Sequence, residues 1–226
     1  MQVDVRHGPS FALARCTLAA GEHVKVESGA MAAMSDGVTL DAKMEGGFLK
    51  SLGRSALGGN SFFVTSYTSS VDGAWVDVAA ILPGDITVIE STPERPLAVT
   101  RGAWLANEQS LAMDTKWGGA NNLFGGEGGF VSRFDGAGKV VVASYGALDM
   151  HALQAGERLV VDSGHVVAYD AYIAMQAQTT GGVMKSLKSG EGIVLEITGP
   201  GLVWTQSRNP NGLVTWLTNV LPFSRS

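Results

Sequence analysis

The sequence has a single cysteine, Cys16, so it can form neither an internal disulfide bond nor a cysteine-based metal cluster, which suits a reducing compartment. It lacks any run of 18 or more apolar residues, and its first residues alternate polar and apolar side chains without the apolar core of a signal peptide. The 16 Lys and Arg residues are outnumbered by 21 Asp and Glu residues, which argues against a general nucleic-acid-binding surface. We therefore expect a cytoplasmic protein whose partner is not nucleic acid.

Glycine, by contrast, is abundant: 30 glycines separate short runs of β-forming residues, the pattern of β-sandwiches and barrels. Three Asp-Gly pairs predict tight hairpin turns, since Gly accepts the positive φ that such turns need. They are Asp36-Gly37, Asp72-Gly73 and Asp135-Gly136. The strands that we expect include residues 24–26, 86–89, 140–145, 159–161, 166–172 and 193–197. The sequence thus predicts an all-β fold.

One segment occurs three times along the chain. The residues from Val26 onward reappear from Val99 and from Val161, each time with Gly in the fourth position, and a second marker follows each copy at residues 63–67, 130–134 and 193–197. Repeats of this size indicate one supersecondary module that was copied and fused, and each copy is too small to bury a core alone. We divide the chain into β module 1 (1–80), β module 2 (81–147), β module 3 (148–210), and a C-terminal helix and tail (211–226).

The C-terminal segment predicts a short amphipathic helix at residues 211–221. Its apolar residues share one helical face: Leu213, Trp216, Leu217, Val220 and Leu221. This stripe is too short to cross a bilayer, and the polar side lacks the Lys and Arg residues with which interfacial membrane helices meet anionic headgroups. We therefore favour docking of the helix on module 3 or on a neighbouring subunit, with peripheral membrane contact as the alternative.

The segment Asp162-Ser163-Gly164-His165 combines three catalytic residue types, but catalytic groups normally converge from distant segments. The other two copies have Glu27-Ser28-Gly29-Ala30 and Thr100-Arg101-Gly102-Ala103 here, so we interpret the shared element as a Gly turn between strands. The histidines show no metal-ligand spacing; they are His7, His23, His151 and His165. We assign no catalytic, cofactor-binding or metal-binding residue and leave open whether His165 binds a ligand.

Three further patterns have a structural interpretation. The glycine-rich stretch 118–129 lacks the Gly-Lys-Ser/Thr ending of a phosphate-binding loop, so we expect a turn or interface loop there. The basic segments that begin at Lys50 and Lys185 are interpreted as solvated loops, with anion binding as the alternative. We expect the tryptophans to anchor the core and interfaces rather than to line a ligand site; they are Trp75, Trp104, Trp117, Trp204 and Trp216.

Several motifs occur in order along the chain: Glu27-Ser28-Gly29-Ala30-Met31, Gly102-Ala103-Trp104-Leu105-Ala106, Ser144-Tyr145-Gly146, Val161-Asp162-Ser163-Gly164-His165 and Gly199-Pro200-Gly201-Leu202-Val203-Trp204. Together they resemble the family of the mitochondrial biogenesis factor "altered inheritance of mitochondria 24", which has many uncharacterised bacterial members. One departure is Gly59-Asn60-Ser61, where similar proteins often have Glu before the Ser. The resemblance implies three tandem β-sandwich modules of double-stranded β-helix type in a pseudo-threefold arrangement. Each module would be similar to a subunit of the tryptophan RNA-binding attenuation protein.

The family resemblance implies no activity, so we expect a non-enzymatic binding or scaffold protein without a cofactor. It also implies a place in a membrane-associated or stress-response assembly with a protein partner not yet identified. The alternative is a sensor that binds an amino-acid-like metabolite in clefts between the modules. We further expect a homo-oligomer formed through the module faces, because the outward faces of the end copies still need covering.

Overall fold

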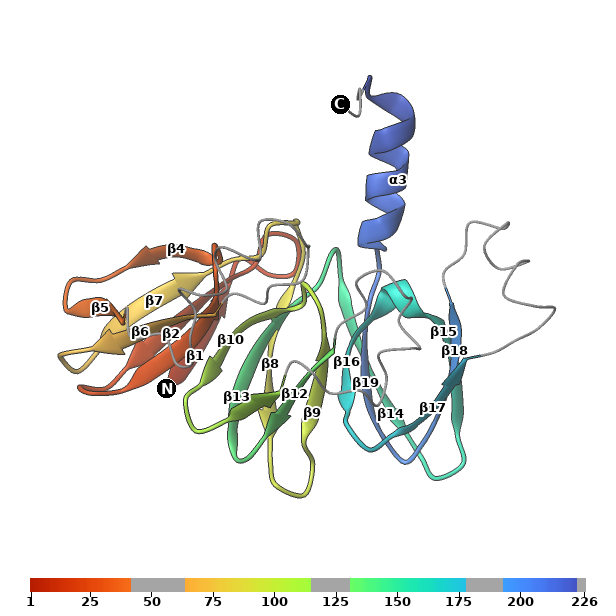
Figure 1. The fold of residues 1–226 in the computed structure, drawn as a ribbon, viewed down its shortest axis with the longest axis horizontal. Helices are drawn as coiled ribbons and strands as arrows, with labels where there is room; N and C mark the ends of the chain where they lie inside the picture. The colour runs from red at the N-terminus through yellow and green to blue at the C-terminus, as the bar shows by residue number, and fades with distance from the viewer. Residues whose placement is uncertain (42–63, 115–130, 178–192, 223–226) are drawn as a thin grey trace, which may run out of the picture.

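In the computed structural model, which describes residues 1–41, 64–114, 131–177 and 193–222, the chain forms antiparallel β-sheets followed by one C-terminal α-helix (Figure 1). The expected all-β architecture with a short terminal helix is confirmed. The sheets stand one behind another along the long axis of the molecule, in the order of the chain (Figure 1).

The strands follow one another module by module, in the order of the chain. Module 1 holds β1 (Gln2–Arg6), β2 (Leu13–Leu18), β3 (His23–Glu27), β4 (Met31–Met34), β5 (Val38–Asp41), β6 (Val64–Ser69) and β7 (Ala74–Val78). Module 2 holds β8 (Ile86–Ser91), β9 (Leu97–Thr100), β10 (Trp104–Glu108), β11 (Ala112–Asp114), β12 (Val131–Asp135) and β13 (Gly138–Ala143). Module 3 holds β14 (Leu148–Leu153), β15 (Arg158–Asp162), β16 (Val166–Asp170), β17 (Ala174–Ala177), β18 (Val194–Thr198) and β19 (Gly201–Gln206).

Neighbouring modules share sheets. The two inner sheets have the strand orders β5-β6-β3-β10-β13-β8 and β11-β12-β9-β16-β19-β14, so each combines three strands of one module with three of the next. They are joined by the antiparallel pairs β3–β10 and β9–β16. The outer sheet of module 1 has the order β1-β2-β7-β4, and the outer sheet of module 3 has the order β15-β18-β17. The modules are therefore linked through main-chain hydrogen bonds as well as through the covalent chain.

The core lies between the sheets in three clusters, and the clusters cross the module boundaries. Strand β13 shows how: Val140 and Val142 belong to the middle cluster, whereas Val141 and Ala143 belong to the cluster of module 1. Successive residues of a strand point to opposite faces, so an inner strand that is apolar throughout supplies two cores at once. Outer strand β2 instead buries only alternate residues, Ala14, Cys16 and Leu18, against module 1.

The turns that join these strands fit the sequence. Each Gly of the three Asp-Gly pairs has a positive φ, with 86° at Gly37, 79° at Gly73 and 111° at Gly136. The Gly of the repeated turn does so in two copies, with 91° at Gly29 and 82° at Gly102. In the third copy a 3-10 turn, η1 (Ser163–His165), replaces this geometry.

The C-terminal helix α3 spans Pro210–Val220. The helix expected from the sequence, residues 211–221, agrees with it within one residue at each end. Its N-cap is Asn209, whose side chain accepts a hydrogen bond from the backbone N–H of Asn211 at 2.9 Å. No helix in the described part of the chain is long and apolar enough to cross a membrane.

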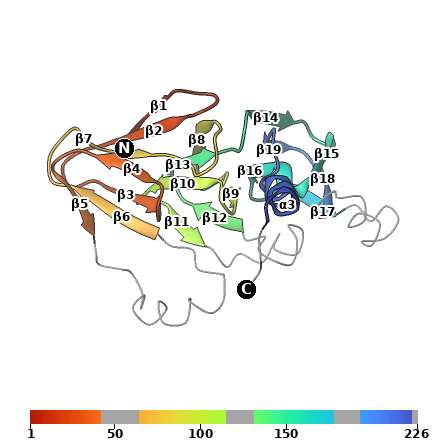
Figure 2. The same ribbon diagram turned by 90° about the horizontal axis from the view of Figure 1, so that it is seen from above.

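Of the two docking sites expected for this helix, the structure does not show the one on module 3, whereas docking on a neighbouring subunit stays a prediction. No side chain of α3 is buried, and Trp216 is 59% exposed. The residues before the helix are tied to the turn after β13, because the N–H groups of Ser207 and Arg208 donate to the carbonyls of Ala147 and Tyr145. The chain therefore leaves the rim of the sheet pointing outward, and the helix stands away from the body (Figure 1) and is seen end-on from above (Figure 2).

The tryptophans take different positions. Trp104 and Trp204 are buried in the middle cluster, as expected of core anchors. Trp75 lies on the outer sheet of module 1 with the Arg15 guanidinium 3.6 Å above its ring centroid. Trp216 is on the exposed helix rather than in the core, and Trp117 lies outside the described residues.

Candidate functional site

The segment Asp162-Ser163-Gly164-His165, which the sequence marked for its catalytic residue types, forms the turn between β15 and β16. The Asp162 carboxylate accepts a hydrogen bond from the Gly164 N–H at 2.8 Å. The His165 Nδ1 lies 2.6 Å from the Gln206 carbonyl oxygen, so this nitrogen carries the proton and donates. Both contacts are with backbone atoms and hold the turn in shape, which fits the structural interpretation.

The four histidines have different contact partners. His23 and His151 each contact a threonine hydroxyl, Thr68 at 2.6 Å and Thr205 at 3.0 Å. His7 lies in a turn, where its carbonyl accepts from the N–H of Phe11. Among the described residues no three His, Cys, Asp or Glu side chains gather as metal ligands would. The basic segments at Lys50 and Lys185, the glycine-rich stretch 118–129 and Gly59-Asn60-Ser61 lie outside the described residues.

A cleft of about 290 Å³ opens where the three modules and the start of the C-terminal helix meet. We call it the junction cleft. Module 1 contributes the end of β3 and the connection to module 2, module 2 contributes the β9–β10 turn and the end of β13, and module 3 contributes the end of β19. The residues that line it are Glu27, Ala80, Ile81, Leu82, Thr100, Arg101, Gly102, Ala103, Ala143, Ser144, Tyr145, Gln206 and Pro210.

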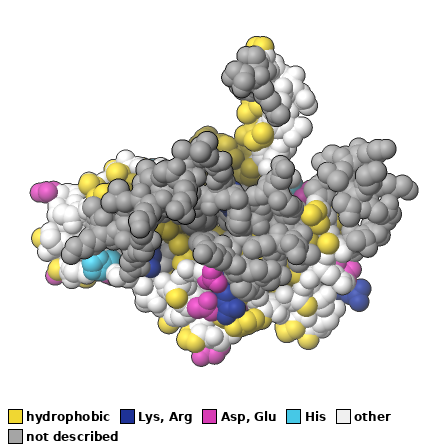
Figure 3. Space-filling view, in the orientation of Figure 1, with side chains coloured by type: hydrophobic (Ala, Val, Ile, Leu, Met, Phe, Trp, Pro, Cys, Tyr) yellow, Lys and Arg dark blue, Asp and Glu magenta, His cyan; other side chains and the backbone are white. Residues whose placement is uncertain are grey.

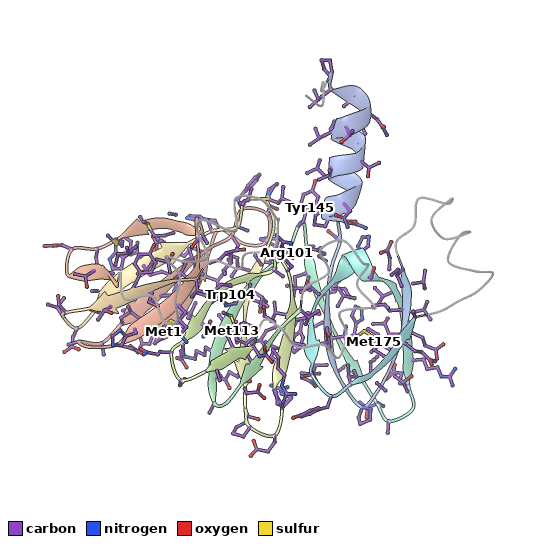
Figure 4. The ribbon with its side chains drawn as sticks, viewed as in Figure 1. Met1, Arg101, Trp104, Met113, Tyr145 and Met175 are labelled. Atoms are coloured by element: carbon purple, nitrogen blue, oxygen red, sulfur yellow. The ribbon has the colours of Figure 1, made fainter. Side chains whose placement is uncertain are left out.

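Opposite charges face the junction cleft from two modules. Glu27, at the end of β3, is half-buried, whereas Arg101, in the turn before β10, is exposed. Burial raises the pKa of Glu27, and the positive charge of Arg101 offsets part of that shift. In Figure 4, Arg101 and Tyr145 lie at the rim of the modules below the helix. The cleft thus offers a carboxylate, a guanidinium and a phenol ring beside apolar side chains.

Other polar groups around the cleft are occupied by the fold. The Gln206 side chain accepts from the Tyr145 N–H at 2.8 Å and donates to the Gly164 carbonyl at 3.0 Å. The Thr100 hydroxyl lies 2.9 Å and 3.0 Å from the carbonyls of Val166 and Val167. These side chains bind the modules together. The ionisable side chains that line the cleft are Glu27, Arg101 and Tyr145.

A second hollow, of about 390 Å³, lies at the opposite ends of the strands, where the β8–β9 turn of module 2 meets module 3. Its charged groups are Glu94, Arg95 and Asp170, with 3.8 Å between Arg95 Nε and Asp170 Oδ1. Burial raises the pKa of Asp170, while its hydrogen bond from the Leu202 N–H, at 2.8 Å, opposes that shift. Because this carboxylate already fixes the start of β19, we regard it as structural.

Sequence reasoning did not single out Glu27 and Arg101 as a charged pair. Both belong to the repeated Gly turn, where they were compared only with their own counterparts. A signal was present, because module 2 has Arg101 where the other copies have Ser28 and Ser163. The arginine indicates a charged pair only once the β3–β10 junction is known, because that junction brings Glu27 at the end of β3 to the turn that holds Arg101.

The fold and the junction cleft describe an all-β protein of several sheets with a helical extension. The chain belongs to the mitochondrial biogenesis AIM24 family, whose model matches residues 3–208. It is 29% identical over 232 residues to an uncharacterised protein of Streptococcus pyogenes serotype M6, covering 99% of this chain and 92% of that protein. A crystal structure of a Streptococcus pyogenes protein from a structural genomics consortium has a TM-score of 0.79 and 26% identity, with 97% of this chain and 99% of that chain covered. The likeness of the modules to the attenuation protein stays a prediction.

Proposed function

We propose that this protein is a non-enzymatic binding or scaffold module that holds a protein partner through its C-terminal helix. The observation that carries the proposal is the exposure of the helix. It bears no charged side chain, and its large apolar residues, among them Val214, Trp216 and Val220, face solvent (Figure 3). An amphipathic helix that its own chain leaves uncovered is suited to insertion in an apolar groove of a partner.

The family resemblance supports a role in an assembly at a membrane or in a stress response. The cytoplasmic location that belongs to this proposal rests on the amino-acid sequence, which has a single cysteine and no signal-peptide pattern at its first residues. A protein partner is favoured over direct lipid contact, because an interfacial helix normally has Lys or Arg on its polar face and α3 has Thr and Asn there.

The test is affinity capture from the native host with the full-length protein and two charged variants of the helix. Trp216→Glu places a carboxylate on the apolar face, whereas the control Thr215→Glu places the same charge on the polar face. A partner that is retained by the wild type and by Thr215→Glu but lost with Trp216→Glu supports the proposal. A partner retained equally by all three proteins contradicts it. Co-sedimentation with anionic liposomes that is lost with Trp216→Glu supports the membrane alternative.

The junction cleft favours a second candidate function, a sensor for a small metabolite. A zwitterion such as an amino acid presents a carboxylate that suits Arg101 and an ammonium group that suits Glu27, with Tyr145 and Leu82 available for its side chain. The cleft volume, about 290 Å³, is at the small end of ligand sites and fits a molecule of that size.

A thermal-shift screen with amino acids, nucleotides and metal salts tests this second function. A ligand at 100 times its dissociation constant stabilises a protein by about 2.7 kcal/mol, a rise in Tm of about 5 to 10 °C at this chain length. Arg101→Gln should abolish the shift, and Arg158→Gln, far from the cleft on the outer sheet of module 3, should preserve it. No shift with any compound would count against the sensor.

A further inference from the structure

Two end strands, β4 and β15, correspond to the strands that pair at the internal module junctions. In the described part of the chain, neither has a junction partner. At the first junction β3 pairs with β10, and at the second β9 pairs with β16. The repeat makes β4 the counterpart of β10 and β16, and it makes β15 the counterpart of β3 and β9. Among the described residues β4 pairs only with β7, and β15 pairs only with β18.

The correspondence between these strands holds residue by residue. Strand β10 has a register shift between Trp104 and Ala106 in its pairing with β13, β16 has one between Val166 and Ala168, and β4 has one between Met31 and Ala33. At the two internal junctions the second residue of each shift is an alanine that faces a valine of the preceding module: Ala106 faces Val26, and Ala168 faces Val99. The corresponding residues at the chain ends are Ala33 and Val161.

Solvent exposure separates the end strands from their internal counterparts. Met34 is 41% exposed, whereas its counterparts Asn107 and Tyr169 are 0% and 2% exposed. On the other strand Val160 is 54% exposed, while its counterpart Lys25 is half-buried and its counterpart Ala98 is fully buried. The end strands thus present to solvent positions that the internal junctions cover wholly or in part.

Strand β4 and the middle of β15 are apolar, but the ends of β15, Arg158 and Asp162, and the outer faces of the end modules are polar. Strand β4 has the sequence Met-Ala-Ala-Met, without the charges or proline by which natural edge strands avoid pairing. The outer face of module 1, in contrast, carries an ion cluster of Asp77 with Arg6 and Arg15, and that of module 3 carries Glu196 with Arg158. A second molecule is therefore better suited to the edges than to the faces.

We propose that β4 of one molecule pairs antiparallel with β15 of a second copy of this chain, which repeats the internal junctions between molecules. The register of those junctions places Ala33 opposite Val161 and Met34 opposite Val160. The two outer sheets then become one continuous sheet of order β17-β18-β15-β4-β7-β2-β1, matching the shared sheets inside the chain. Directly opposed residues share a face of a sheet, so Met34 and Val160 cover one another.

Such a contact is head to tail, because it joins two different surfaces of the same chain. Each molecule then has two different free edges, β15 and β4, and each edge pairs with the other kind of edge on a neighbouring molecule. Head-to-tail contacts close into a ring when the rotation between copies permits and otherwise continue as a filament. This assembly is independent of the binding function proposed for the C-terminal helix.

The experiment uses two full-length variants that each block one edge with a charge. Met34→Lys blocks β4, and Val160→Lys blocks β15; both side chains are exposed, so the fold itself should be retained, which circular dichroism checks. The control is Met150→Lys, which places the same charge on the edge strand β14, at a residue 55% exposed. Light scattering after size exclusion gives the mass of each protein, alone and in an equimolar mixture.

We expect the wild type and Met150→Lys to form assemblies larger than a dimer, and each edge variant alone to have the monomer mass of 23.5 kDa. Mixing the two edge variants should give one heterodimer of about 47 kDa, twice the chain mass, because each supplies the edge that the other lacks. A monomeric wild type at tens of micromolar, an effect of only one edge variant, or a mixture that stays monomeric would overturn the proposal.

Discussion

Replacing Asp77 by Asn should cost more stability than any other single change of an ionised side chain on the outer sheet of module 1. Asp77 lies on β7, and its side chain is 6% exposed. Arg15 donates two hydrogen bonds to it, at 2.8 Å and 2.9 Å, and Arg6 donates a third at 2.9 Å. Asn keeps the shape of the side chain but removes the charge that both guanidinium groups face.

The size of the effect follows from these contacts. A hydrogen bond to a charged group contributes about 1.5 to 3 kcal/mol, and breaking a fully buried ion pair costs about 3 to 5 kcal/mol. Arg6 and Arg15 are each about a third exposed, so water can solvate them when the carboxylate is lost. We therefore expect a loss of about 2 to 4 kcal/mol at pH 7, toward the lower part of that range.

The loss should depend on pH in a definite direction. The hydrogen bonds from Arg15 and then from Arg6 lower the pKa of Asp77 in the folded protein. A carboxyl group with a lowered folded-state pKa contributes its full stability above the unfolded value of about 3.9 and loses it as pH falls through the folded value. The difference between wild type and Asp77→Asn should thus be constant from about pH 5 to 7 and shrink below about pH 4.

Urea unfolding followed by tryptophan fluorescence at several pH values measures this difference. The matched control is Asp135→Asn, because Asp135 also pairs with an arginine, Arg133 at 2.6 Å, but is 42% exposed. Exposed ion pairs contribute about 0 to 1 kcal/mol. A free energy of unfolding for Asp77→Asn within about 0.5 kcal/mol of wild type at pH 7, or a difference that grows on acidification, would refute the reasoning.

Three further predictions concern single sites in the described part of the chain. Burial raises the pKa of the Cys16 thiol to about 12, so a maleimide should label it quickly in urea but, in native buffer, only when module 1 opens. Fast labelling of the native protein at pH 7 would contradict this. Gly84→Ala should destabilise the protein by about 3 kcal/mol or more, since a Cβ there would lie 1.8 Å from the Ser144 carbonyl oxygen, while Gly212→Ala on the helix should be neutral or slightly stabilising in the same unfolding assay. Ending the chain at Asn209 should leave the free energy of unfolding within about 1 kcal/mol of wild type, because no helix side chain is buried; a larger loss would show that the helix packs on the body.

The sequence predicts local structure well where the signal is local. Asp-Gly turns, the strands at residues 86–89 and 159–161, and the terminal helix all depend on neighbouring residues, and the structure has each of them. Two expected strands, 140–145 and 166–172, end two residues early, at Ala143 and Asp170. At the first of these ends the Ser144 hydroxyl donates to the carbonyl of Gly146 at 2.9 Å, which stabilises a turn.

The sharing of sheets between modules was beyond the reach of sequence patterns. Residues 140–143 are apolar without a period of two, which is typical of any strand buried on both faces. Nothing in that run says that Val140 and Val141 belong to cores on opposite sides of a shared sheet. The outward course of the helix was missed for a similar reason, because the apolar stripe of α3 is equally suited to its own chain and to a partner. The hydrogen bonds of Ser207 and Arg208 direct the chain away from the sheets, and nothing in the helix sequence encodes them.

The repeat also explains why the charged pair occurs at one junction of the chain. At the first junction Glu27 of module 1 and Arg101 of module 2 line the same cleft. The corresponding residues at the second junction are the uncharged Thr100 and Ser163, and the Thr100 hydroxyl is already bonded across that junction. At the junction proposed between molecules, the corresponding residues are Asp162 and Ser28 of the next copy, so a serine stands where Arg101 stands at the first junction. If the junction cleft binds a zwitterion as proposed, each chain offers one matching site, and calorimetry should give a binding stoichiometry of one per subunit.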